Sequence, residues 1–398
     1  MQMPEPCPEI EMLLCCARIR VDAVTAARIG ALASAPLDWE HLFRLSRFHG
    51  LMPLLYWHLN NLCPDKIPLS VWNKLRDNFH SNAARNLLLL NELRSLLSLF
   101  KAQGIAAVAL KGPLLATTVY RSLSLREFCD LDILVPDQEV QSVKQILIAR
   151  GYRAKPELES QFDASLMRFH SERAFVQDDG LCAVDLHWKL SAKQFPFPLD
   201  VYSSPECLTT VPLNGTEVTT LAPDYLLLYL AVHGAKHLWT RLEWICCLAE
   251  IIRTNQQINW NKLFTLARML NVERILTLGL CISKVLLRID LPRIALAKVQ
   301  DDPTVRILTE QVKTRIYSGR DFQPGILENY VFTIRAMDST ADGIGVCLKS
   351  LLTPTFPDWS AIQLPGYLLP IYYFIRPLRL LGKYGAQLTR IATRRSQA

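Results

Sequence analysis

Two aspartates, Asp130 and Asp132, flank a leucine at the start of an apolar segment that continues to Val135. Such a segment is typical of a β-strand, in which alternate side chains point to opposite faces. The two carboxylates therefore share one face, while Leu131 and Ile133 share the other. Carboxylates this close resist joint ionisation unless a cation compensates them. Since Mg²⁺ prefers oxygen ligands and commonly joins carboxylates to phosphates, the pattern predicts a metal site.

A third carboxylate, Asp185, lies in residues 182–188, a second apolar segment typical of a strand. Its side chain shares a face with His187, whose simplest interpretation is a polar neighbour of Asp185. Two carboxylates on one strand and a third on another can hold two Mg²⁺ ions, with Mn²⁺ as an alternative. Such a pair stabilises the attacking and leaving oxygens of an in-line phosphoryl displacement. We therefore predict that Asp130, Asp132 and Asp185 are the metal ligands and the catalytic residues.

Lys111 and Gly112 follow a short apolar stretch, residues 105–110, and precede a helical pattern that runs to Tyr120. A strand, a glycine turn, a helix and then an Asp-x-Asp strand is the layout of a nucleotidyl-transfer site. Gly112 would let a triphosphate approach the backbone, and Lys111 beside the turn would offset its charge. Arg126 precedes the Asp-x-Asp pattern and could reach a phosphate with its planar guanidinium. The simpler alternatives are a surface lysine and an arginine paired with a neighbouring acid.

Several segments together resemble the bacterial "uncharacterised nucleotidyltransferase" family, which belongs to the DNA polymerase β-like nucleotidyltransferase superfamily. In the expected core, the resemblance is carried by residues 110–112, 126–135 and 184–188. In the flanking regions, it is carried by residues 38–39, 48–53, 221–223, 233–239 and 242–244. It covers roughly residues 35–260, with a further segment at 372–379.

The resemblance implies an enzyme that transfers a nucleoside monophosphate from an NTP such as ATP to an unknown acceptor. It implies that Asp185 helps to deprotonate the acceptor, and that His233 and His237 line the nucleotide cleft from one helix face. A metal site at these histidines is disfavoured, because Gly234 stands where zinc proteases carry a glutamate. The implied fold is α+β, with a small mixed-sheet nucleotidyltransferase core flanked by N-terminal and C-terminal helical regions.

Two departures from the family pattern bear on activity. Where the superfamily usually has a serine after the glycine, this chain has Pro113, which supplies neither a hydroxyl nor a backbone N–H. A helix beginning near Leu114 would still point its remaining amides at a phosphate. Where family members often carry an aspartate after the later tryptophan, this chain has Cys246 and Cys247. One alternative therefore stays open: a non-catalytic nucleotide- or partner-binding pseudo-nucleotidyltransferase that keeps the carboxylates but has lost productive triphosphate geometry at Pro113. A further alternative is a toxin-like tRNA nucleotidyltransferase, for which the basic residues at the end of the chain are an argument.

The cysteine content and the hydropathy indicate the compartment. The chain has 398 residues and eleven cysteines, an odd number, with no Cys-x-x-Cys pair. This predicts a reducing cytoplasm, no disulfide framework and no zinc site. Residues 1–6 lack the basic start of a signal peptide. No run of about eighteen apolar residues occurs, so we expect no transmembrane span.

Most of the formal net charge of +7 comes from the last segment of the chain, which carries six basic residues and one acid from Thr355 onward. Residues 364–375 are apolar and precede the first two of these arginines. A basic amphipathic tail of this kind is suited to weak peripheral contact of residues 364–398 with a membrane surface or with nucleic acid. The simpler alternative is a docked terminal helix with a solvated basic end.

The pattern of elements divides the chain into four parts. We expect an N-terminal helical region (1–100), the nucleotidyltransferase α/β core (101–192), a C-terminal helical region (193–354) and the basic amphipathic tail (355–398). Within the core, the expected elements are the strands already described, a strand at 173–176, and a helix at 137–150 that Gly151 terminates. Residues 194–215, rich in Pro, Ser and Thr, are predicted to be a linker or an excursion.

Overall fold

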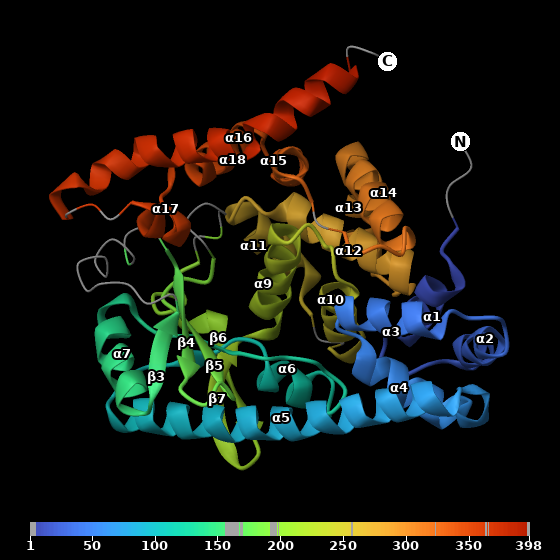
Figure 1. The fold of residues 1–398 in the computed structure, drawn as a ribbon. Helices are drawn as coiled ribbons and strands as arrows, with labels where there is room; N and C mark the ends of the chain where they lie inside the picture. Colours follow the sequence, from blue (N-terminus) through green and yellow to red (C-terminus); the bar gives the residue numbers. More distant parts are fainter. Residues whose placement is uncertain are drawn as a thin grey trace.

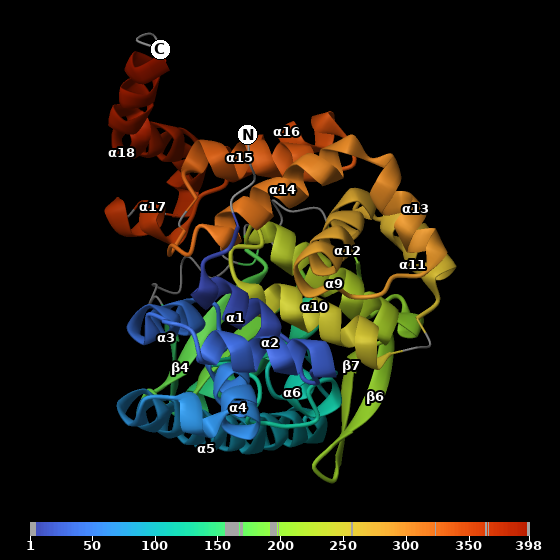
Figure 2. The same cartoon turned by 90° about the vertical axis from the view of Figure 1, so that its right-hand side faces the viewer.

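The computed structural model describes residues 5–155, 167, 170–191, 197, 199–255, 258–322, 324–362, 364 and 366–395, with the backbone alone for 366–367 and 384–395. In these residues a seven-stranded mixed sheet is surrounded by helices (Figures 1 and 2). The expected α+β fold, with helices flanking a small mixed-sheet core, is confirmed.

The N-terminal region is helical, as expected. It contains α1 (Pro8–Cys16), α2 (Ala23–Ala33), α3 (Trp39–Phe48), α4 (Met52–Leu62), the 3-10 turn η1 (Pro64–Lys66) and α5 (Leu69–Ala102). The 34 residues of α5 span about 50 Å, which lets this single helix run beneath both the sheet and the N-terminal helices (Figure 1).

The sheet combines strands from the whole middle of the chain. The strands are β1 (Val108–Ala109), β2 (Leu131–Leu134), β3 (Tyr152–Lys155), β4 (Glu172–Gln177), β5 (Ala183–His187), β6 (Leu208–Leu213) and β7 (Thr216–Leu221). Their spatial order is β3-β4-β5-β2-β1-β7-β6. β2 runs parallel to β5, and β1 runs parallel to β7, whereas the other neighbours are antiparallel. β2, which carries the Asp-x-Asp pattern, therefore lies near the centre of the sheet.

The two faces of the sheet carry different cores. Leu131 and Ile133 on one face pack with leucines of α5 and with α7 (Val140–Ala149). Leu134 points to the opposite face and packs with the N-terminal and C-terminal helices. This alternation agrees with the strand periodicity expected from the sequence. Asp132 shares the face of Leu134, so its carboxylate is directed away from α5 and towards the C-terminal helices.

The prediction of a linker or an excursion at residues 194–215 is wrong for residues 208–213. Residues 208–213 form β6, which pairs with β7 in an antiparallel hairpin, and Figure 2 shows this hairpin extending beyond the rest of the sheet. The turn is Asn214-Gly215, and both residues have positive φ, as a tight hairpin turn requires. The Pro and Thr content hid the alternation of buried Leu213 and Val218 with exposed neighbours. The sheet therefore extends past residue 192, where we expected the core to end.

The other core elements differ from the expectations mainly in length. β1 keeps only two residues of the expected 105–110 strand. The helix after the glycine turn is α6 (Pro113–Thr118), and the helix expected at 137–150 is a 3-10 turn, η2 (Asp137–Glu139), followed by α7. Gly151 ends α7 with φ 81°, the conformation expected of a helix-terminating glycine.

The C-terminal half is helical beyond β7, as expected. After the 3-10 turn η4 (Pro205–Cys207) and the hairpin, it contains α9 (Pro223–Lys236), α10 (Leu242–Thr254), α11 (Trp260–Met269), α12 (Glu273–Leu287), α13 (Arg293–Asp301), α14 (Pro303–Tyr317), α15 (Ile326–Ala336), α16 (Thr340–Leu352), α17 (Phe356–Ala361), η5 (Gly366–Ile371) and α18 (Tyr372–Arg395). α9 lies over the sheet on the side opposite α5 (Figure 1). Among the described residues, no helix has the length and apolar character needed to cross a membrane.

The first turns of α18 are docked on the protein. Tyr372 is fully buried, and the guanidinium groups of Arg376 and Arg379 form ion pairs with Asp358 of α17, at 2.9 and 2.5 Å. The Asp358 side chain has no exposed surface. Two of the basic residues that we assigned to a charged tail therefore anchor the helix instead.

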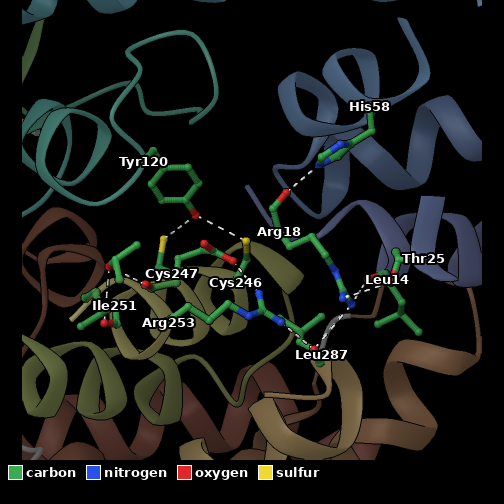
Figure 3. A network of polar contacts seen from close by, with 12 residues as sticks. Leu14, Arg18, Thr25, His58, Tyr120, Cys246, Cys247, Ile251, Arg253 and Leu287 are labelled. Atoms are coloured by element: carbon green, nitrogen blue, oxygen red, sulfur yellow. Dashed lines mark hydrogen bonds and ion pairs between the residues drawn. The ribbon is translucent and has the colours of Figure 1, made fainter. Parts of the chain in front are cut away.

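The N-terminal helices are fastened to the C-terminal half through a backbone carbonyl group (Figure 3). Arg18, which follows α1, donates a hydrogen bond to the carbonyl oxygen of Leu287 at 3.5 Å, and Arg253 of α10 donates to the same oxygen at 2.7 Å. The carbonyl group of Arg18 in turn lies 2.7 Å from the His58 Nε2 atom of α4. α1, α4, α10 and α12 are thus joined into one unit beside the sheet (Figure 1).

Candidate active site

The register of the sheet places two of the three predicted carboxylates side by side. β2 and β5 run parallel, and Asp132 is the direct neighbour of Asp185. His187 shares the face of Asp185, two residues along β5. Ligand atoms of Asp132, Asp185 and His187, one from each, lie within 4.8 Å of one another. Asp130 precedes β2 and lines the same cavity, outside this group of three.

Crowding of the carboxylates perturbs their protonation. Burial, together with the charges of Asp130 and Asp132, raises the pKa of Asp185 to about 6. Burial and the charge of Asp132 also raise the pKa of Asp130. Burial alone would raise the pKa of Asp132 as well, but Lys111 and His187 outweigh it and hold that pKa below its usual range. The site therefore holds more negative charge than its resident cations compensate.

Lys111 already occupies part of the predicted metal site. Its Nζ lies 3.0 Å from Asp132 Oδ1, and His187 Nε2 lies 3.1 Å from the same oxygen. Burial would lower the pKa of Lys111, but Asp132 and further neighbours outweigh burial and raise it, so the ammonium stays charged. The other ring nitrogen of His187, Nδ1, lies 3.2 Å from Glu172 Oε2 on β4. Lys111 and a divalent cation would thus compete for the same carboxylate.

Gly112 has the strained backbone that the glycine turn predicts. Its φ of 54° is in the region that disfavours other residues, and a Cβ there would lie 3.2 Å from the Asp130 carbonyl oxygen. The turn is therefore pressed against the Asp-x-Asp segment. α6 has fewer backbone N–H groups available for a phosphate than we predicted, because the N–H group of Leu114 donates to the carbonyl oxygen of Lys111. Pro113 is buried.

Arg126 lines the cavity, yet its guanidinium is engaged with the protein. Nη1 donates to the carbonyl oxygen of Gly112 at 3.4 Å. Burial would lower the pKa of Arg126, but Cys247 and Tyr120 raise it. The Tyr120 hydroxyl lies 3.3 Å from Cys247 Sγ and 3.5 Å from Cys246 Sγ (Figure 3). The two cysteines that depart from the family pattern therefore support the glycine turn from α10.

His233 and His237 face the carboxylates from α9. Their rings are 4.7 Å apart, and the His237 ring stacks on Trp244 of α10 at 4.9 Å with 29° between the planes. Burial, with a contribution from Lys236, lowers the pKa of His237 to about 4, and burial together with Lys111 lowers the pKa of His233 well below its usual value. Both imidazoles are therefore neutral near pH 7 and form an aromatic surface with Trp244.

One cavity of about 410 Å³ brings the predicted site residues together. All eight of them line it: Lys111, Gly112, Arg126, Asp130, Asp132, Asp185, His233 and His237. The structure adds residues that we did not assign to the site: Arg85, Glu172, Tyr229, Lys236, Arg241, Glu243 and Trp244.

Some of the added residues carried a signal in the sequence. Tyr229 and Lys236 lie four residues before and three after His233, so they share its helix face. Glu172 shares a strand face with Ala174, which pairs with Asp185, but we predicted that this strand begins one residue later, at 173. Arg85 comes from α5 and had no local signal, because only the packing of a distant helix brings it to the cavity.

The helical motif around His49 reaches the site through α10. Glu243 donates its backbone N–H to the His49 carbonyl oxygen at 3.1 Å, and Leu242 donates to His49 Nδ1 at 3.3 Å. A Cβ on Gly50 would lie 2.1 Å from Glu243 Oε2, so only glycine allows this approach. Two segments almost 200 residues apart in the family pattern are therefore one structural unit.

The donor set fits a divalent cation. Two adjacent carboxylates and an imidazole suit Mg²⁺ or Mn²⁺, the imidazole favouring Mn²⁺. The raised pKa of Asp185 is what an added cation would relieve.

Comparison with known proteins agrees with this geometry. Residues 35–288 match the model of the family described as "Uncharacterised nucleotidyltransferase", which is more than half of the chain. The match includes every residue that lines the cavity, whereas α13 to α18 lie outside it. No curated protein and no solved structure matches the chain.

Proposed function

Because the chain belongs to the uncharacterised nucleotidyltransferase family, we propose that it transfers a nucleoside monophosphate from an NTP to an acceptor hydroxyl or phosphate. The observation that carries this proposal is the pairing of Asp132 with Asp185 across two parallel strands, in a cavity of about 410 Å³. A cavity of this size suits a ligand as large as a nucleotide. ATP is the first triphosphate to test.

Asp130, Asp132 and Asp185 are the proposed metal ligands, with His187 as an additional donor on the same face. Two Mg²⁺ ions, or Mn²⁺ ions, would offset phosphate charge and polarise the reacting oxygens when bound. Asp185 is the proposed acceptor of the proton from the incoming hydroxyl.

Lys111 is the proposed phosphate-binding residue with the largest role. Its ammonium group, now 3.0 Å from Asp132, would be free to pair with a phosphate oxygen if Asp132 held a metal ion. Lys236, 3.9 Å from Glu172, faces the same cavity. Gly112 would give the phosphates access to the backbone, while Arg126 would act at the edge of the turn that it supports.

His233, His237 and Trp244 are the proposed contacts of the nucleobase. Neutral imidazoles and an indole present flat aromatic faces, and bases stack on such surfaces irrespective of sequence. The His237–Trp244 stack at 4.9 Å already shows the geometry that an added ring would continue.

A binding protein that has lost transfer activity is the second candidate, and the Lys111–Asp132 ion pair favours it. An ammonium group that satisfies the carboxylate removes part of the need for a metal, and Pro113 lacks the hydroxyl of the family pattern. The toxin-like alternative loses support, because its argument was a free basic tail and two of the tail arginines are paired with Asp358.

A labelling experiment tests the proposal. The protein is incubated with Mg²⁺, a cell extract and each NTP labelled at the α- or the γ-phosphate. Transfer of a nucleoside monophosphate moves the α-label to an acceptor and leaves the γ-label in pyrophosphate. The Asp130→Asn/Asp132→Asn variant should transfer no label, whereas the matched exposed change Asp77→Asn on α5 should behave as wild type.

Calorimetry separates the two candidates when no transfer is found. Wild type that binds Mn²⁺ with nucleotide but transfers nothing, together with a Pro113→Ser variant that gains transfer, would identify a binding protein on an enzyme scaffold. Equal metal–nucleotide binding by wild type and the double aspartate variant would eliminate the site itself.

The cytoplasm is the proposed location. It supplies NTPs, and its reducing conditions agree with eleven free cysteines, of which Cys129 is the exposed one.

A further inference from the structure

The C-terminal layer, which we define as α16, α17 and α18 (residues 340–395), lies outside the matched family range and has its own composition. From Thr340 to the end the chain has seven basic residues and two acids, Asp342 and Asp358. Asp358 is fully enclosed by its ion pairs with Arg376 and Arg379, whereas Asp342, at the start of α16, is exposed. The layer therefore carries an excess of positive charge.

The outer face of α18 is apolar. Phe374, Leu378 and Leu381 are 74%, 68% and 61% exposed, although large apolar side chains of helices normally face a core. Their spacing of four and three residues places them on one face of the helix.

The opposite face of α18 holds the helix on the protein. At 100° per residue, Arg376 and Arg379 lie roughly half a turn away from Phe374 and Leu378. Arg376 also donates to the carbonyl oxygen of Ser350 at 2.8 and 3.0 Å. The docked face is thus the charged one, so the amphipathic helix turns its apolar face outward. In Figure 1 α18 runs along the top of the molecule, with its end projecting beyond the body.

α16, which contacts α18, leaves a second apolar row uncovered. Ile344, Leu348 and Leu352, spaced four residues apart, are 46%, 52% and 43% exposed. Exposed apolar groups of this number in one region mark a surface that is covered by something else.

We propose that the C-terminal layer binds the surface of an anionic phospholipid bilayer, with α18 parallel to the surface and Phe374, Leu378 and Leu381 inserted at the acyl boundary. An outward apolar helix face beside excess positive charge is the combination that such surfaces bind. The proposal does not depend on nucleotidyl transfer.

Nucleic acid and a second copy of the chain fit the layer less well. Nucleic acid would use the positive charge of the layer but would leave Phe374, Leu378 and Leu381 exposed to water, because its binding depends on phosphate contacts. Two copies would bring two basic layers together, and like charges oppose that contact.

Vesicle flotation of the full chain tests the proposal. Wild type should bind vesicles of phosphatidylcholine and phosphatidylglycerol at about 2:1, bind pure phosphatidylcholine more weakly, and lose the difference at high salt. The Phe374→Gln/Leu378→Gln/Leu381→Gln variant keeps the net charge and should bind at least about tenfold more weakly. The matched control is Leu87→Gln/Leu88→Gln, which changes exposed leucines of α5 on the far side of the molecule in Figure 1 and should bind as wild type.

The remaining outcomes overturn the proposal. A wild type that binds neither vesicle, or a glutamine triple variant that binds as well as wild type, excludes insertion of α18. Binding of bulk tRNA that the triple variant retains, without vesicle binding, assigns the layer to nucleic acid. A wild-type dimer in ultracentrifugation that the triple variant dissociates, without vesicle binding, assigns it to self-association. Circular dichroism melting of each variant verifies that the protein remains folded.

Discussion

Asp132 and Asp358 are both buried aspartates, and each is contacted by two nitrogen-bearing side chains, yet Asp132 lines a cavity whereas Asp358 fixes one helix to another. Lys111 and His187 contact one oxygen of Asp132 at 3.0 and 3.1 Å. A second carboxylate, Asp185, lies beside it on the neighbouring strand. The partners of Asp132 are therefore shared with other acids, since His187 also contacts Glu172.

Asp358 is the acid to which both of its arginine partners are paired. Arg376 and Arg379 contact different oxygens of Asp358, and Thr355 donates its backbone N–H and its hydroxyl at 2.8 and 2.7 Å. Burial raises the pKa of Asp358, but the Thr355 and arginine hydrogen bonds outweigh it and the pKa is lowered.

The comparison shows that ion pairing alone does not distinguish an acid proposed to bind a metal from an acid that stabilises the fold. Both aspartates have a lowered pKa. The difference lies in the neighbours: around Asp132 the other acids, Asp130 and Asp185, have a raised pKa. Uncompensated negative charge beside a cavity is what an incoming cation can use.

The largest effect is expected from removing the structural acid. Asp358→Ala leaves two partly buried guanidinium groups unpaired and should lower the free energy of unfolding by about 3 kcal/mol or more. Nucleotide binding by the folded fraction should be unchanged, because α17 is outside the cavity. Urea unfolding measures the loss, with the exposed Asp342→Ala of α16 as control. An equal loss in both variants would mean that the Asp358 pairs contribute nothing specific.

Asp132, the proposed metal ligand, should affect transfer activity more than the free energy of unfolding. Asp132→Asn should reduce label transfer by at least about 100-fold. Loss of a residue that orients a metal ligand costs up to about 100-fold in activity, and loss of the metal ligand itself should cost no less. The measurement is the transfer rate at saturating NTP, reported per folded molecule. A variant that retains most of its activity would show that Asp132, like Asp358, is structural.

Protonation sharpens the comparison. In metal-free buffer, Asp185→Asn should stabilise the protein at pH 7 by about 1–3 kcal/mol, because the folded protein disfavours the charged carboxyl. The pKa is raised from 3.8 to about 6, so this penalty is absent below pH 3.8 and complete above pH 6. Asp358 has a lowered pKa, so its contribution is present above its unfolded value of 3.8 and is lost as the pH falls through the folded pKa. Between pH 3 and 7, the free energy of unfolding relative to wild type should therefore rise for Asp185→Asn and fall for Asp358→Ala. Parallel pH dependences of the two variants would refute this difference.

The smallest effect is expected from replacing Lys111, which contacts Asp132. Lys111→Ala should lower the turnover number about tenfold, some 1.4 kcal/mol of barrier, and should change stability less than Asp358→Ala does. Lys111→Arg, which keeps the charge, should recover part of the rate. If both variants lose stability and activity in proportion, Lys111 serves only to neutralise Asp132.

The local elements of the core were predictable because their signals are local. Alternation over residues 130–135 gave the face that each side chain takes, and Lys111-Gly112 marked a turn that only glycine tolerates without strain. β6 and β7 were missed because their Pro and Thr content conceals the pattern, although Asn214-Gly215 is a strong hairpin signal. The ends of β1 and α6 depend on packing and differed from the expectation.

The sequence by itself determined which residues are the candidates for the chemistry. The Asp-x-Asp pattern, the third aspartate and the histidine pair of one helix face all lie at spacings that backbone geometry converts into shared faces. Only the tertiary structure decided how these parts meet. The Asp132–Asp185 register, the Lys111 contact and the stacking of His237 on Trp244 join residues distant in the sequence. Likewise, the apolar segment followed by basic residues indicated an amphipathic tail, but the docking of α18 through Asp358 decided that its apolar face points outward. Contacts of this kind depend on chain topology, which no local pattern encodes.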